Sequence, residues 1–114
     1  MVKRIVGVAM IAAAAVAAAA PALAQQALSP SDQVEVWKAC VLAKAAQYAV
    51  TAEAADTVAR AAVLACQDGW TAYVDLLEAG GADVPAAMTS ADKTEKRLAD
   101  RALVAVMEIR SARR

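Results

Sequence analysis

The two cysteines are the feature that most constrains how this chain folds. Cys40 and Cys66 are the only cysteines, and they lie in two helix-forming runs within the stretch from Trp37 to Trp70. In an exported protein, a single pair of cysteines most simply forms one disulfide. We therefore predict a helical hairpin joined by a Cys40–Cys66 bond. A loop of about 26 residues closed in this way would stabilise the fold by roughly 3 kcal/mol. Two separate reactive thiols, or a bridge between two chains, are the alternatives.

The predicted bond also sets the register of the hairpin. In two antiparallel helices, the residue numbers of facing positions add up to a roughly constant value. For Cys40 and Cys66 this value is 40 + 66 = 106, so the turn should centre near half of it, at residue 53. The two tryptophans then lie on the side of the disulfide away from the turn. We expect Trp37, Trp70 and Tyr73 to form one aromatic layer that fills the core, because bulky rings supply most of the buried area in an alanine-rich bundle. A ligand pocket between the rings is the alternative interpretation.

The first 24 residues have the pattern of an export signal. Lys3 and Arg4 precede the uncharged run 5–20, and Ala22-Leu23-Ala24 has the small-x-small form of a cleavage site. We predict cleavage after Ala24 and a periplasmic or secreted protein. A retained membrane anchor is the competing interpretation, but the run is mostly alanine and shorter than the roughly 20 residues that a span needs. Cleavage would leave 114 − 24 = 90 residues, 25–114, as one small domain.

Capping residues and helical periodicity predict three helices in the remaining chain, at about 30–50, 52–79 and 90–112. Ser29 and Pro30 suit the start of the first, Thr51 that of the second, and the Thr89–Asp92 segment that of the third. The segment 82–88, which contains Pro85, is expected to be a loop. Gly69 either lies within the second helix or marks a bend in it. No alternation typical of strands is present, so the predicted fold is all-α, a small three-helix bundle built on the disulfide-linked hairpin.

Charge is unevenly distributed along the chain. Without residues 1–24 the net charge is −2, divided into −5 for residues 25–91 and +3 for residues 92–114. A chain of this overall charge is not typical of nucleic-acid binding proteins. The basic residues of the third helix are a candidate interaction surface for an acidic protein partner or an anionic membrane: Lys93, Lys96, Arg97, Arg101 and Arg110. Helix capping and solubility are the simpler explanation of the same charges.

The residues that most enzymatic sites require are missing from the sequence. The chain has no histidine, which removes the Ser-His-Asp triad and histidine-ligated zinc or haem. It also lacks the CxxC, GxGxxG and P-loop motifs. The carboxylate pairs Glu53/Asp56 and Asp75/Glu78 lie on the polar face of the second predicted helix, where solvated charge is expected. We predict no catalytic residue, no cofactor and no metal site.

The sequence thus favours an exported, non-enzymatic binding or interaction module with an unidentified protein partner. No stable membrane insertion is expected after signal cleavage, and the loop 79–90 is long enough to allow a domain-swapped homodimer. The alternative is a periplasmic stress or chaperone-like protein that exposes its apolar helical seam, that is, the apolar residues along which its helices pack. In architecture the predicted fold resembles the small helical acid-stress chaperones of the periplasm, which also have one disulfide. No motif accompanies that resemblance, so we assign no family.

Overall fold

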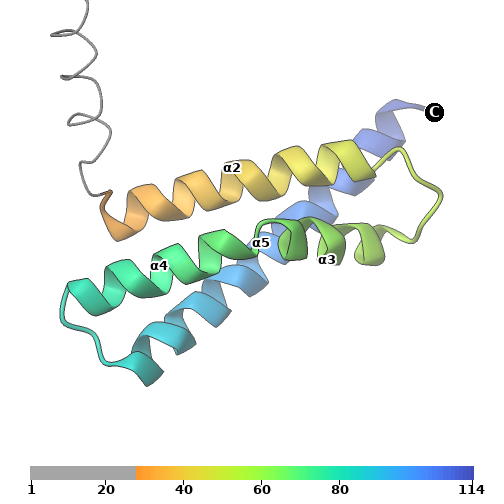
Figure 1. The fold of residues 1–114 in the computed structure, drawn as a ribbon. Helices are drawn as coiled ribbons and strands as arrows, with labels where there is room; N and C mark the ends of the chain where they lie inside the picture. Colours follow the sequence, from red (N-terminus) through yellow and green to blue (C-terminus); the bar gives the residue numbers. More distant parts are fainter. Residues whose placement is uncertain (1–27) are drawn as a thin grey trace, which may run out of the picture.

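The computed structural model describes residues 28–114, and these residues form four α-helices without any strand (Figure 1). The helices are α2 (Pro30–Tyr48), α3 (Ala55–Ala65), α4 (Gln67–Ala79) and α5 (Val84–Ala112). The all-α prediction is confirmed, but the number of helices is four rather than three. The predicted signal peptide, residues 1–24, lies outside the described residues.

A disulfide joins the two arms of a helical hairpin, as predicted. Cys40 of α2 is bonded to Cys66 with an S–S distance of 2.05 Å and a Cα–Cα distance of 6.0 Å. Helix α2 runs antiparallel to α3 and α4, which follow each other along its length (Figure 1). The long helix α5 crosses this hairpin and contacts α2, α3 and α4.

The second predicted helix is divided at Cys66. This residue ends α3 and begins α4, with φ −112° and ψ 27°, and its amide bonds to the Val63 carbonyl three residues back. The expected single helix 52–79 is therefore wrong, and Gly69 lies in the first turn of α4 rather than at the bend. The helical spacing of apolar residues continues from α3 into α4. The periodicity of the sequence therefore does not reveal that the backbone at Cys66 departs from helical geometry.

The hairpin turn lies close to the predicted centre, but its capping differs from the prediction. The turn spans residues 49–54, and the N-cap of α3 is Ala54, which has no side-chain capping bond. Thr51 instead donates from its hydroxyl to the Tyr48 carbonyl at 2.9 Å. Thr51 therefore closes the end of α2 and does not start α3.

Helix α5 starts six residues earlier than expected. Asp83 is its N-cap, and one of its carboxylate oxygens accepts from the Ala86 amide at 2.8 Å. Pro85 belongs to the first turn, where a missing amide proton costs nothing because the first amides of a helix have no intrahelical partner. The expected loop 82–88 and the predicted cap at Thr89–Asp92 are thus wrong. Both Thr89 and Ser90 lie inside α5.

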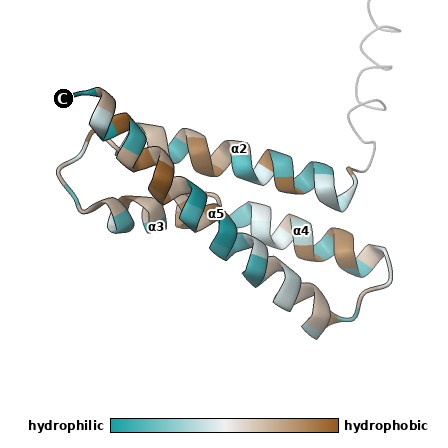
Figure 2. Ribbon diagram, turned by 180° about the vertical axis from the view of Figure 1, so that it is seen from behind, coloured by the Kyte–Doolittle hydropathy of each residue, from teal (hydrophilic) through white to brown (hydrophobic). Residues whose placement is uncertain are grey.

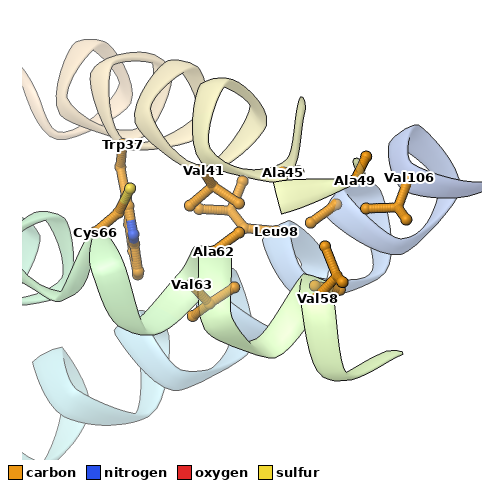
Figure 3. Close-up of a cluster of buried hydrophobic side chains, with 12 residues drawn as sticks. Trp37, Val41, Ala45, Ala49, Val58, Ala62, Val63, Cys66, Leu98 and Val106 are labelled. Atoms are coloured by element: carbon orange, nitrogen blue, oxygen red, sulfur yellow. The ribbon is translucent and has the colours of Figure 1, made fainter. Parts of the chain in front are cut away.

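The core is one main cluster between α2, α3 and α5, with a smaller one between α4 and α5 (Figure 3). In Figure 3 the Trp37 ring extends from α2 toward the Cys66 sulfur, while Val41 and Leu98 lie between the helices. Alanine contributes many of the buried positions, so the helices approach closely and each contact buries little area. The large buried side chains are correspondingly few: Trp37, Val41 and Val106 are the largest that are almost fully enclosed.

Candidate functional site

A groove between α2 and α5 forms a concave surface on the described chain. It has a volume of about 780 Å³, and Tyr73 of α4 lies at its base. In Figure 1, α2 and α5 diverge toward the start of α2, and α4 lies between them there. One wall comes from α2, from Pro30 to Lys38, and the other from α5, from Thr94 to Arg101.

Two arginines on the α5 wall give the groove its charge. Arg97 and Arg101 are exposed and separated by four residues, so they lie on the same helix face. Neither side chain makes an ion pair or a side-chain hydrogen bond with any residue in the range 28–114. Leu98 lies between them on the inner side of the helix, at 5 % exposure. The two guanidinium groups are therefore available to an incoming anion above an apolar base.

The α2 wall is nearly neutral. Lys38 is bonded to Glu35 at 2.8 Å, one turn away on the same helix, so their charges largely cancel. Ser31 adds a hydroxyl, and Val34 adds apolar surface. The net positive charge of the groove thus comes from Arg97 and Arg101, both of which the sequence had indicated as interaction residues. The contribution of α2 was not predicted, since spacing along α2 does not show which of its residues α5 leaves uncovered.

The remaining residues of the predicted basic surface lie elsewhere. Lys93 and Lys96 are exposed on α5 outside the groove. Arg110 is engaged within the chain: its guanidinium donates to the carbonyls of Ala49 at 3.1 Å, Thr51 at 2.9 Å and Glu53 at 2.7 Å. The five predicted residues therefore do not form one surface, and Arg110 instead attaches α5 to the hairpin turn.

The three aromatic residues of the predicted layer have different surroundings. Trp37 is 1 % exposed and its ring centroid lies 6.2 Å from that of Tyr73, with the rings tilted by 42°. Trp70 is half-buried, packs against both core clusters and donates from its indole nitrogen to an Asp92 carboxylate oxygen at 3.0 Å. Tyr73 is the member that reaches the groove. The rings thus contribute to packing, and of the three only Tyr73 lines the groove between α2 and α5, while Trp37 lines a smaller depression beside Gly69.

The predicted carboxylate pairs do not form metal sites in the described part of the chain. Asp56 is exposed and pairs with Arg60 at 3.6 Å, and Asp75 is exposed. No group of three or more histidine, cysteine, aspartate or glutamate side chains is placed to hold a metal ion among residues 28–114. Both cysteines are in the disulfide. The groove is therefore the strongest candidate site.

No helix between residues 28 and 114 combines the length and the apolar character that a membrane span requires. Comparison of the chain with protein-family models, with curated proteins and with solved structures finds no match. The function must therefore be argued from the geometry of the groove.

Proposed function

We propose that this protein is a non-enzymatic binding module that holds a carboxylate-bearing segment of a partner protein in the groove between α2 and α5. The observation that carries the proposal is the position of Arg97 and Arg101, two arginines without side-chain partners among residues 28–114, on one wall of a concave surface. Arginine side chains presented in this way suit carboxylates, because the planar guanidinium offers parallel donors that match two carboxylate oxygens.

The surroundings of the arginines favour a protein segment over a flat anionic surface. Tyr73 and Leu98 line the base of the groove, so a ligand must enter between the two helices to contact them. A peptide can place a carboxylate against the arginines and an apolar group against this base. A membrane surface reaches only the outer rim, where the attraction is weak and screened by salt.

The non-enzymatic part of the proposal is supported by the sequence and by the state of the cysteines. The chain contains no histidine, and its two thiols are consumed in the Cys40–Cys66 bond. Glu35, the acidic residue that lines the groove, is paired with Lys38. The groove thus offers charge and shape for binding, and no activated nucleophile contributes to it.

Export is a further part of the proposal. It is supported by the signal-like pattern of residues 1–24 and by the disulfide, because such bonds persist mainly in oxidising compartments. Mass spectrometry of the protein from a bacterial periplasmic fraction tests it. A mature chain beginning at Gln25 is the expected result, and an intact N-terminus in that fraction contradicts cleavage.

Binding is tested by NMR titration with N-acetylated, C-amidated tri-aspartate, using tri-asparagine as the neutral probe. We expect shifts at groove residues with tri-aspartate only, and at least tenfold weaker binding for Arg97→Glu/Arg101→Glu. Lys93→Glu/Lys96→Glu is the matched control, because it changes the net charge equally on the same helix outside the groove. Equal losses in both double variants would show attraction to net charge and would contradict a groove site.

The chaperone-like alternative requires the apolar seam to open. In the folded chain Val41, Ala45, Ala62 and Val106 are fully enclosed, and the disulfide holds α2 to the α3–α4 junction. This arrangement supports binding at the surface of the folded protein over exposure of the seam. Binding of an apolar dye tests the alternative: a steep rise between about pH 5 and pH 2 would favour the chaperone, and an unchanged signal would disfavour it.

A further inference from the structure

We infer that the groove continues into an apolar ledge along α5, and that the site as a whole recognises a segment with acidic residues at one end and apolar residues at the other. This inference rests on the proposed function and specifies its ligand. The ledge is defined by Leu42 of α2 and by Val104 and Met107 of α5.

Continuity is shown by shared lining residues. Arg101 lines both the groove and a second depression of about 240 Å³, which Leu42 and Val104 also line. Val104 in turn lines a third depression of about 410 Å³ together with Met107. The first two depressions therefore lie between α2 and α5, and the third, which α5 alone lines, adjoins them on the exposed surface of α5.

The chemistry changes from the groove to the ledge. Arg97 and Arg101, which pair with no side chain in the described range 28–114, lie at the beginning, while Val104 and Met107 farther along are 52 % and 55 % exposed. Figure 2 shows a hydrophobic stretch on α5 that follows its hydrophilic middle, before hydrophilic residues return in the last turns. Glu108 lies beside the ledge and would repel an acidic residue placed there. A segment with its acidic end at Arg97 and Arg101 is therefore the complementary ligand.

The combined length of the groove and the ledge indicates a peptide rather than a small molecule. Ser111 lines the far end of the ledge on α5, 111 − 97 = 14 positions after Arg97. At about 1.5 Å per residue of helix this corresponds to roughly 21 Å. An extended chain covers that distance with about six residues at roughly 3.3 Å each.

Capped hexapeptides test the inference by fluorescence anisotropy with the intact, disulfide-bonded protein. The probes are three aspartates followed by three leucines, the reverse order, and two controls in which asparagines replace the aspartates or serines replace the leucines. We expect one of the two orders to bind at least tenfold more tightly than both controls. Arg101→Glu should remove the advantage over the asparagine control, and Met107→Ser should remove the advantage over the serine control.

A matched methionine variant serves as the control for Met107→Ser. Met88→Ser changes a comparably exposed methionine of α5 outside the groove and the ledge and should leave binding unchanged.

Equal binding of the leucine and serine probes would overturn the apolar ledge and would leave the groove as a site for acidic residues. Failure of every aspartate probe would overturn the proposed function as well. Binding to phosphatidylglycerol vesicles without peptide binding, lost in Arg101→Glu, would assign the surface to a membrane instead.

Discussion

The α-carbon of Gly69 faces the indole ring of Trp37 so closely that no side chain fits between them. A Cβ placed on Gly69 would overlap Trp37 Cδ1 and Cγ and would lie 2.9 Å from Trp37 Cβ. The contact lies one turn after Cys66, where the disulfide already holds α4 close to α2. A glycine that weakens the helix locally therefore allows the largest core side chain to pack between the two helices.

Overpacking by Gly69→Ala should cost about 1–3 kcal/mol. Alanine regains roughly 1 kcal/mol in helix propensity, so we expect a net destabilisation of up to about 2 kcal/mol. Urea unfolding measures the change in the free energy of unfolding.

In a Trp37→Leu background the same substitution should cost less, because a smaller side chain leaves room for the added methyl group. Gly80→Ala is the control, since a Cβ there meets the Leu77 carbonyl oxygen at an ordinary 3.5 Å; equal costs at both glycines would contradict the steric argument.

Removal of the disulfide should lower the free energy of unfolding by about 3 kcal/mol, because the unfolded chain regains the freedom of a 26-residue loop. Cys40→Ala/Cys66→Ala should show this loss in urea unfolding. The reduced wild-type protein should behave similarly, and a reductant should have no effect on the double variant. Mass spectrometry under non-reducing conditions should show one intramolecular bond, and a covalent dimer would be inconsistent with the structure.

Arg110→Ala should destabilise the protein by about 2 kcal/mol, because it leaves three carbonyls of the hairpin turn without their donor. Hydrogen exchange in the segment 49–54 should accelerate in the variant. Arg110→Lys keeps the charge but not the fork of donors, so an intermediate loss is expected. Arg113→Ala changes an exposed arginine at the end of α5 and should have little effect. Similar losses for both alanine variants would indicate a general charge effect.

Asp83→Ala should cost about 1 kcal/mol, since it removes the side chain that caps α5. Ser90→Ala should be nearly neutral, because Ser90 is an exposed residue within the helix. Thermal unfolding of the two variants distinguishes the observed start of α5 from a start near residue 90. A larger loss for Ser90→Ala than for Asp83→Ala would support the later start.

Several elements follow from local sequence chemistry. Ser29 and Pro30 predict the start of α2, and the Ser29 hydroxyl indeed accepts from the Asp32 amide at 3.1 Å. The start of α5 is also encoded locally, in Asp83 followed by Pro85, but a proline in this position is equally typical of a loop. A proline two residues after a capping aspartate is compatible with a helix start, and this pattern would have given the correct boundary.

By itself, the sequence determined the all-α fold, the Cys40–Cys66 pairing and the antiparallel register of the hairpin, because periodicity and a single pair of cysteines allow few other arrangements. Tertiary structure alone decided where the second helix breaks, that Arg110 binds the turn, and that Arg97 and Arg101 border a groove. The first feature depends on the backbone conformation at Cys66, and the last two on the rotation and crossing of α5 over the hairpin. That geometry results from the packing of alanine-rich faces. Because their side chains are small and similar, the sequence pattern does not show which of them will be in contact.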